Sequence, residues 1–465
     1  MPHDLTSLRL SIWRGHTSAA EQVERSIERA LSPAGRAAWM HFTPERARAQ
    51  AASVDADLRA GRPLPPLAGL PFSVKDLFDV AGEVTRAGSR VLADEPPATQ
   101  HAPAVARLLA GGGSLIGRTH MVEFAFSGVG TNPHYPTPAA FDGRWHQTVG
   151  APDEPRVPGG SSSGAAVSVA TGAALIGLGS DTGGSVRIPA ALNGIVGFKG
   201  TARCVPTEGT VPLSITLDTV GALTRSVRDA ILVHELLAAR TVTRTAAPLA
   251  AWRLAVVRHP MLEALDETVG RAFERSLARL RQAGAQVEEI DLPVLDELTE
   301  LTARAHFSPV ESYAWHRERI AKRGAEYDPR VAARILRGAE VPAYAYIELI
   351  AGRRRWIARM EAALRDYDAV LSPTTPIVAP RLADVAPADG RDAALDAARD
   401  AEFFRVNALL LRHTSVVNML DGCALTLPCH TPDELPVGLM LWAPAMRDEA
   451  ILNLGLRVEE SLQIK

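Results

Sequence analysis

Residues 179–190 read GSDTGGSVRIPA, and an earlier run, GGSSSG at 159–164, also places serine directly after paired glycines. Ser161 and Ser185, the serines that follow the two glycine pairs, stand 24 positions apart. Adjacent glycines adopt backbone conformations closed to other residues, and their unobstructed N–H groups can converge on an anion. The two runs therefore predict a loop-built site for a developing negative charge, with a serine hydroxyl held against it.

The sequence around these runs alternates apolar strands with helices. Phe72 and Val74 alternate with polar residues and predict a strand, residues 103–110 predict a helix stopped by three glycines, and residues 115–116 predict the next strand. A second unit follows, with a strand at 254–257 and a helical stripe of apolar residues at 269–280. This pattern predicts an α/β fold with a large mixed, mostly parallel sheet covered by helices on both faces.

Local signals place the first helices. Ser18 and Glu21 form a capping box, and Thr43 with Pro44 supplies a cap residue and a first-turn proline for the next helix. The longest uncharged run, 157–180, is long enough to cross a bilayer, but its start is rich in glycine and hydroxyl groups. We interpret this run as buried core.

We expect one domain over residues 1–465. The chain shows no internal repeat and no low-complexity linker. Residues of about 295–365 are rich in Arg, Glu and Ala with apolar residues at helical spacing, which predicts a mostly helical insertion. Residues 127–164, dense in Gly, Pro, Asn and Asp, predict a long loop of the kind that often carries function.

The composition excludes several classes of protein. The 465 residues are 46% hydrophobic and 22% charged, and the net charge of −3 gives no field for nucleic acid or anionic lipid. Three cysteines without a C-x-x-C pair, Cys204, Cys423 and Cys429, favour neither disulfides nor a zinc site and indicate a reducing compartment. Since residues 1–17 lack the apolar stretch of a secretory signal, the expected location is the cytoplasm. We predict no metal and no cofactor.

Lysine is scarce in this chain. The 50 basic residues include only four lysines: Lys75, Lys199, Lys322 and Lys465. Lysine can lose its proton when it is desolvated, whereas arginine cannot, so each lysine is a candidate base. At an ordinary pKa of about 10.4, Lys75 would be neutral in fewer than roughly one molecule in a thousand at pH 7. Burial at the end of its strand would lower that pKa and allow Ser161 to relay a proton from Ser185 to Lys75.

The segments around this set resemble the amidase signature family. The family's motifs are matched by GLPFSVKD at 69–76, by both glycine–serine runs, by GIVGFK at 194–199, by YDAVLSPTTP at 367–376 and by LPVGL at 435–439. The resemblance spans most of the chain, and its central block is highly specific. It implies the amidase-signature fold and hydrolysis of amides through an acyl-enzyme.

By this resemblance, Lys75 matches the catalytic base, Ser161 the relay serine that follows a cis peptide bond, and Ser185 the acylated nucleophile. The backbone N–H groups of four residues match the oxyanion hole: Thr182, Gly183, Gly184 and Ser185. Three residues match positions that support the loop: Asp181, Arg187 and Ser162. The sequence departs from the family at Ser163, where many members have glycine, and at Gly200, where proline is common.

Other patterns in the sequence compete with this one. The pattern G-x-S-x-G at 160–164 fits the nucleophile elbow of α/β-hydrolases, with Ser162 as nucleophile, but a Pro-rich loop rather than a strand precedes it, so we set this interpretation aside. The glycines at 177–184 loosely fit a phosphate loop, which would make a nucleotide-binding protein. Glu123 and Asn418 match frequent family positions, and structural roles fit them equally well. The chain also resembles the glutaminase component of a tRNA-dependent amidotransferase.

The expected partner is a small-molecule amide substrate, with no nucleic acid and no membrane, and the family suggests a homodimer. The variable segments 127–158 and 295–365 are expected to form the substrate pocket. Four residues within them are candidates for lining it: His134, Tyr135, Phe307 and Tyr313.

Overall fold

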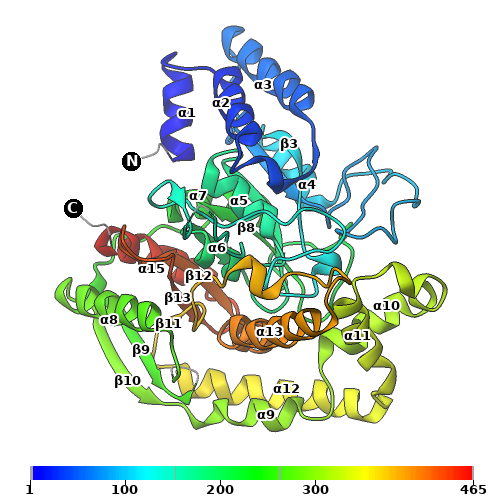
Figure 1. Ribbon diagram of the computed structural model, residues 1–465. Helices are drawn as coiled ribbons and strands as arrows, with labels where there is room; N and C mark the ends of the chain where they lie inside the picture. Colours follow the sequence, from blue (N-terminus) through cyan, green and yellow to red (C-terminus); the bar gives the residue numbers. More distant parts are fainter. Residues whose placement is uncertain (1–3, 152, 261–262, 463–465) are drawn as a thin grey trace.

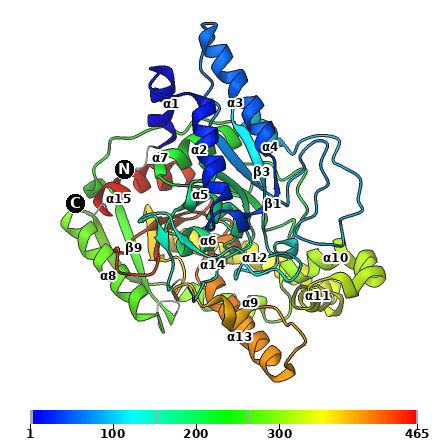
Figure 2. The same cartoon turned by 45° about the horizontal axis from the view of Figure 1, so that its top comes forward.

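The computed structural model describes residues 4–151, 153–260 and 263–462. One large sheet has the strand order β1-β3-β2-β6-β8-β7-β12-β13-β11-β9-β10 (Figures 1 and 2). Its strands are β1 (Trp39–Phe42), β2 (Pro71–Lys75), β3 (Ser114–Thr119), β6 (Ile176–Asp181), β7 (Val196–Lys199), β8 (Thr219–Thr224), β9 (Arg253–Arg258), β10 (Gln286–Asp291), β11 (Ala369–Pro373), β12 (Cys423–Pro428) and β13 (Gly438–Ala443). A separate ribbon pairs β4 (Phe141–Asp142) with β5 (Gln147–Thr148).

The pairing of the strands is mixed. Two groups of parallel neighbours, β3-β2-β6 and β11-β9-β10, flank a central antiparallel run through β8, β7, β12 and β13. At one edge, β1 pairs antiparallel with β3. The large mixed sheet expected from the sequence is confirmed.

Helices cover both faces of this sheet. They are α1 (Leu5–Trp13), α2 (Ala19–Leu31), α3 (Pro44–Arg59), α4 (Pro103–Ala110), α5 (Ser163–Thr171), α6 (Arg187–Leu192), α7 (Val227–Ala238), α8 (Glu267–Gln282), α9 (Glu297–Thr302), α10 (Phe307–Arg323), α11 (Pro329–Leu336), α12 (Ala343–Leu364), α13 (Ala393–Leu411), α14 (Thr414–Met419) and α15 (Asp448–Leu462). On β12, Leu425 belongs to an apolar cluster with α7, α8 and α15, whereas its neighbour Ala424 belongs to a cluster with α12 and α14. Successive strand residues point to opposite faces, so both faces are buried.

Most of the predicted elements are confirmed. The strand at Phe72 and Val74 is β2, and the helix at 103–110 is α4. The capping box at Ser18 makes both of its hydrogen bonds. The cap predicted at Thr43 is wrong: α3 begins at the expected proline, but the Thr43 hydroxyl makes no capping bond. Its ψ of 62° lies outside the extended conformation from which a cap side chain reaches the first N–H groups.

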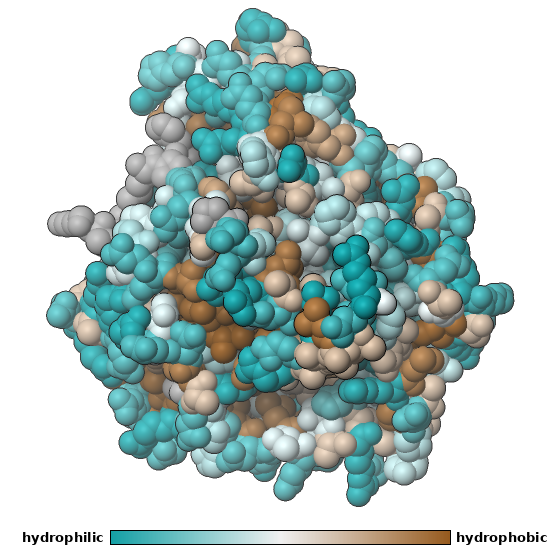
Figure 3. All heavy atoms as spheres, viewed as in Figure 1, coloured by the Kyte–Doolittle hydropathy of each residue, from teal (hydrophilic) through white to brown (hydrophobic). Residues whose placement is uncertain are grey.

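The uncharged run at 157–180 lies in the core, as predicted, and both α5 and β6 are buried along their full length. Within the described ranges, no helix has the length and apolar character that a membrane crossing needs. Hydrophilic side chains cover most of the face seen in Figure 3, with hydrophobic patches near its centre.

Residues 295–365 hold α9 to α12. Figure 1 shows α9 and α12 at the end of the molecule opposite α1–α3, with α10 and α11 beside them, and Figure 2 shows α13 projecting from the same end. The extent of the domain, 1–465, stays a prediction, and 1–3, 152, 261–262 and 463–465 lie outside the described residues.

Candidate active site

Two parallel strands bring the separate motifs together. Neighbouring β2 and β6 pair from Phe72 with Ile176 to Val74 with Leu178. The carboxyl ends of parallel neighbours meet at one edge of a sheet, which is where ligand sites of α/β folds form. Lys75 is the last residue of β2, and Asp181 is the last residue of β6. The run at 159–164 ends in α5, which packs on both strands.

Lys75 lies at the centre of this arrangement. Its side chain is fully buried, and Nζ donates to the Ser161 Oγ at 2.7 Å and to the Ser180 Oγ at 2.8 Å. Burial lowers the pKa of Lys75 to about 7, against the opposing charges of Asp218 and Asp181. The neutral amine is therefore far more populated at neutral pH than it would be for an exposed lysine.

The Ser161 segment lies against Ser185. The peptide bond between Gly160 and Ser161 is cis, as the family resemblance implies. The next N–H, that of Ser162, donates to the Ser185 carbonyl at 3.3 Å. The Ser162 hydroxyl is fully buried and donates to the Ser180 carbonyl at 3.3 Å. That contact fits a supporting role better than the nucleophile of an elbow.

The loop after β6 is fixed by Asp181. Its carboxylate accepts from the N–H groups of Gly184 at 2.8 Å and Val186 at 3.1 Å, and from the Arg187 guanidinium at 2.9 and 3.0 Å. The Asn418 side chain also stabilises this arrangement, because it donates a hydrogen bond to Asp181 at 3.0 Å and accepts one from Arg187 at 2.6 Å. Burial acts to raise the pKa of Asp181, but the adjacent guanidinium holds this pKa well below its ordinary value.

This arrangement corrects one part of the predicted oxyanion hole. The Gly184 N–H donates its hydrogen bond to the Asp181 carboxylate, so this N–H group stabilises the loop. The N–H groups of Thr182, Gly183 and Ser185 stay the predicted donors for an oxyanion. Glycine is nonetheless required at 184, because its φ is +138° and a Cβ there would lie 2.2 Å from the Thr414 hydroxyl.

Ser185 opens onto a cavity of about 530 Å³ that Thr182 and Gly183 also line. The other lining residues come mainly from α9 to α14 and their connections: Leu298, Thr302, His306, Phe307, Ser308, Pro309, Arg334, Arg337, Asn407, Ala408, Leu411, Ser415, Val416, Asn418 and Met419, with Ala125, Phe126, Ser127, Leu213 and Leu217 from elsewhere. A nucleophile candidate thus faces a chamber large enough for a small organic molecule.

The predicted lining residues meet this cavity only in part. Phe307 lines it, whereas His134, Tyr135 and Tyr313 are not among its lining residues. His134 instead lies 2.8 Å from the buried carboxylate of Glu123. Of the described residues in the segment 127–158, only Ser127 lines the cavity. Apolar residues of the rest of this segment, among them Val129 and Val157, pack in a cluster with residues of α6 and α13.

Two residues of the site, Ser180 and Asp218, are not among the site residues predicted from the sequence. The Ser180 hydroxyl is a second hydrogen-bond partner of Lys75. Ser180 could have been predicted from the expectation that parallel strands with polar ends place those ends side by side. Asp218 accepts from the Thr182 hydroxyl at 2.6 Å, and burial raises the pKa of Asp218 to about 6 despite that hydrogen bond. It comes from a loop outside every motif, so no local pattern marks it.

The two departures from the family pattern are accommodated locally. The Ser163 hydroxyl lies 2.8 Å from Nδ1 of buried His120, which gives the extra side chain a polar partner. Gly200 packs closely, since a Cβ there would lie 3.0 Å from an Asp448 carboxylate oxygen. Glu123 accepts from Ser89 at 2.7 Å and from a backbone N–H at 2.7 Å, which is a structural role.

The glycines proposed for a phosphate loop serve packing instead. Gly177 and Gly179 lie inside β6, where an added Cβ would come within 2.8 Å of the Ala165 carbonyl and of the Ser162 hydroxyl, respectively. They let α5 lie close to the strand, so the phosphate-loop interpretation is wrong for this pair. In the part of the chain that the structure describes, no cluster of His, Cys, Asp or Glu is arranged to hold a metal ion.

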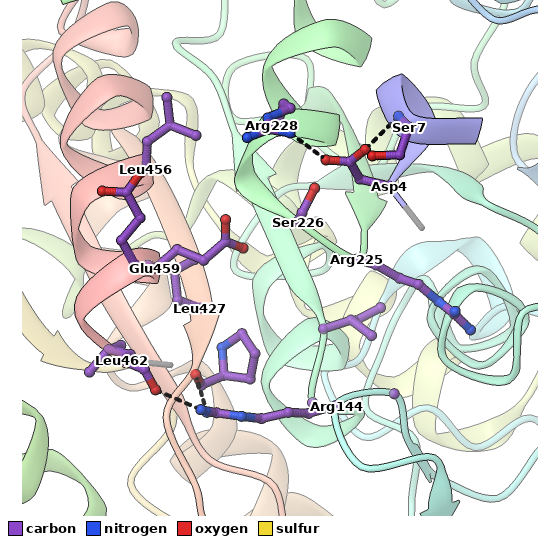
Figure 4. A pocket seen from close by; sticks show the side chains of 15 residues that line it. Asp4, Ser7, Arg144, Arg225, Ser226, Arg228, Leu427, Leu456, Glu459 and Leu462 are labelled. Atoms are coloured by element: carbon purple, nitrogen blue, oxygen red, sulfur yellow. Dashed lines mark hydrogen bonds and ion pairs between the residues drawn. The ribbon is translucent and has the colours of Figure 1, made fainter. Parts of the chain in front are cut away.

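A second cavity, of about 410 Å³, lies between α1, α7 and α15 (Figure 4). Its charged side chains engage protein groups: Arg228 pairs with Asp4 at 2.9 Å, and Arg144 donates to the carbonyls of Pro428 and Leu462. Arg225 likewise donates to carbonyls at the end of α5. This cavity contains none of the Lys75, Ser161 and Ser185 set.

Comparison with known proteins decides the family. Residues 21–452 match the family model described as Amidase. The chain belongs to the amidase signature family. It is 38% identical over 431 residues, covering 91% of this chain and 88% of the relative, to 2-amino-5-chloromuconic acid deaminase of Comamonas testosteroni. It is 31% identical over 99% of its length, and 98% of the relative's, to a glutamyl-tRNA(Gln) amidotransferase component of Salinispora arenicola.

Solved structures agree with this membership. A crystal structure of an amidase superposes with a TM-score of 0.84 at 33% identity and covers 98% of this chain and 99% of its own. The fold expected from the resemblance is therefore confirmed, and this amidase-family chain is an enzyme that acts on carbon–nitrogen bonds.

Proposed function

We propose that this member of the amidase signature family is a serine-dependent amide hydrolase that uses Lys75 as base, Ser161 as proton relay and Ser185 as nucleophile. The observation that carries the proposal is the fully buried amine of Lys75, 2.7 Å from the Ser161 hydroxyl, beside a loop that presents Ser185 to a cavity. A desolvated amine can accept a proton that a charged ammonium cannot.

In the proposed mechanism, neutral Lys75 takes the proton of Ser161 while Ser161 takes the proton of Ser185. The Ser185 oxygen then forms a bond with the carbonyl carbon of the amide, and the carbonyl oxygen becomes an oxyanion facing the N–H groups of 182, 183 and 185. The carbon–nitrogen bond breaks as the relay returns a proton to the leaving amine. Water adds to the acyl-enzyme by the same proton path and releases the acid.

A panel of small amides tests the proposal directly. Ser185→Ala should reduce turnover of every accepted amide by at least about a thousandfold, because no covalent intermediate can form. Ser168→Ala is the matched control: Ser168 is a buried serine of α5 that contacts Ser73 at 2.9 Å, and its loss should leave turnover within about threefold. Equal turnover by wild type and Ser185→Ala would exclude the assignment.

A second function is favoured by one comparison. The 31% identity to an amidotransferase component over nearly the full length supports a glutaminase that delivers ammonia to a partner. Glutamine hydrolysis that appears only with co-purified partner proteins would support this function, whereas hydrolysis of simple amides by the isolated chain would favour the first. The homodimer and the cytoplasmic location stay predictions.

A further inference from the structure

Arg334 is a buried cation at the wall of the cavity that holds Ser185. It lies in α11 and is 9% exposed. Its Nε donates to the Arg330 carbonyl at 3.0 Å, whereas its buried Nη2 has no hydrogen-bond partner among the described residues. A buried charged donor without a partner is unfavourable, and a ligand in the cavity would supply the partner that Nη2 lacks.

The nearby carboxylates form their hydrogen bonds with other groups, although the charge of Asp328 still acts on Arg334 and raises its pKa. Asp400 pairs with Arg330 at 2.6 Å, and Asp328 accepts from the Arg330 N–H at 2.8 Å at the start of α11. The Arg334 guanidinium instead lies 5.1 Å from the ring centre of Phe126, 5.4 Å from Phe403 and 5.7 Å from Phe404. Aromatic rings position a cation without neutralising it.

The charged side chains among the described lining residues of the cavity are arginines, and much of the lining is apolar. Arg337 joins Arg334 on its wall, and none of its lining residues within the described chain is Asp or Glu. Burial and nearby Arg337 lower the pKa of His306, which disfavours its charged form. Burial lowers the pKa of Arg334 only to about 10, so this group stays charged. Leucine, valine, methionine and phenylalanine side chains supply much of the remaining surface, together with hydroxyl and amide groups that include Thr302, Ser308 and Asn407.

We propose that Arg334, with Arg337 beside it, binds a carboxylate of the substrate, so that the enzyme hydrolyses amides of anionic molecules in preference to neutral ones. This inference rests on the proposed function, in which Ser185 attacks the amide of the same molecule. A guanidinium recognises a carboxylate through charge-assisted and often bidentate hydrogen bonds. The apolar lining then contacts the carbon chain between the amide and the acid.

The first test uses the wild-type enzyme. The monoamides of succinic, glutaric and adipic acid are compared with their methyl esters, which have similar size but no charge. For the best acid of the series, kcat/KM should exceed that of its ester by about tenfold or more. Equal values, or a preference for the esters, would overturn the proposal.

The second test uses Arg334→Gln. This variant should raise KM for the acid by about tenfold or more and leave KM and kcat for the ester within about threefold. Arg334→Lys should recover part of the affinity for the acid. Arg319→Gln is the matched control, because Arg319 also stacks on an aromatic ring, 4.3 Å from the centre of Trp315, but lies outside the cavity. Equal losses for acid and ester would overturn the proposal.

A binding measurement separates this proposal from the proposed function and avoids the need for catalysis. Titration of adipate into Ser185→Ala should show binding that weakens about tenfold or more when Arg334→Gln is added, with thermal melting confirming that both variants are folded. No difference in binding would overturn the carboxylate site. If Ser185→Ala retained turnover, the proposed function would fail, whatever the result for Arg334.

Discussion

Lys75 and Lys199 are the last residues of β2 and β7, two strands of the same sheet that β6 and β8 separate, and both lysines are buried. Burial lowers the pKa of Lys75 to about 7 and the pKa of Lys199 to about 8, the latter helped by the charge of Arg187. Their partners differ. Lys75 donates to two serine hydroxyls, whereas Lys199 donates to two backbone carbonyls, at 2.6 and 3.0 Å. A hydroxyl has a proton to give and a carbonyl has none.

The comparison of the two lysines shows that burial lowers the pKa of both amines, but that burial alone does not determine which amine can act as a base. The hydrogen-bond partner decides whether the neutral amine can drive a reaction or only hold two segments together. The remaining described lysine, Lys322, is exposed on α10, and Lys465 lies outside the described residues. We therefore expect chemistry to depend on Lys75 and stability to depend on Lys199.

The largest expected effect is on catalysis at position 75. Lys75→Met and Lys75→Arg should each lower kcat/KM by about a thousandfold or more, because methionine has no base and arginine keeps its proton. Steady-state turnover of the best amide measures this effect, with circular dichroism to confirm the fold. Turnover by either variant within tenfold of wild type would identify another base.

The pH profile tests the lowered pKa of Lys75. In the proposed mechanism the neutral amine of Lys75 is the active form, so log kcat/KM should rise with a slope of one as pH increases and level off above about pH 7. Below that pH each unit should therefore reduce kcat/KM about tenfold. A profile that stays flat from pH 5 to pH 8 would show that no group of this kind limits the reaction.

Lys199→Met should affect stability more than activity. It leaves two buried carbonyls without their donor, which lowers the free energy of unfolding by about 2–4 kcal/mol. Denaturant unfolding measures this change, and kcat of the folded fraction should stay within about threefold of wild type. The distinction between the lysines would be lost if kcat fell as far as in Lys75→Met.

The smallest expected effect concerns the charge of Asp218, which raises the pKa of Lys75. Asp218→Asn removes that charge, so the rising limb of the pH profile should move to lower pH by less than about one unit. Asp229→Asn is the matched control, because Asp229 is another buried carboxyl group whose pKa is raised by burial, to about 7, but it is not among the groups that shift Lys75. A limb that does not move, or that moves equally in the control, would contradict this electrostatic coupling.

Much of the site could be predicted from the sequence because its motifs are local. The glycine pairs before Ser161 and Ser185, and the strand that ends at Lys75, each follow from a few consecutive residues. The strand order that brings them together was expected only as a class, since pairing depends on contacts between distant segments. The hydrogen bond from the Gly184 N–H to Asp181 could not be predicted either. A sequence motif indicates which N–H groups lie near the site, but it does not indicate which of them already donate to another group.

The cavity wall could not be predicted in the same way. Phe307 was expected there, but Arg334 was one of the 50 basic residues and had no distinguishing neighbour in the sequence. Its missing partner becomes visible only when α11 packs against the rings of Phe126 and α13. Helical periodicity predicts that a segment is helical, whereas the side chains that it presents to a cavity depend on tertiary packing.

The most direct test of the central claim is the rate at which a fluorophosphonate probe modifies the protein, followed by mass spectrometry of the peptides. We predict a single adduct on Ser185, formed at a rate that rises with pH up to about 7 in wild type and falls at least a hundredfold in Lys75→Met. Modification of a different residue, or an equal rate of Ser185 modification without the Lys75 amine, would contradict the account.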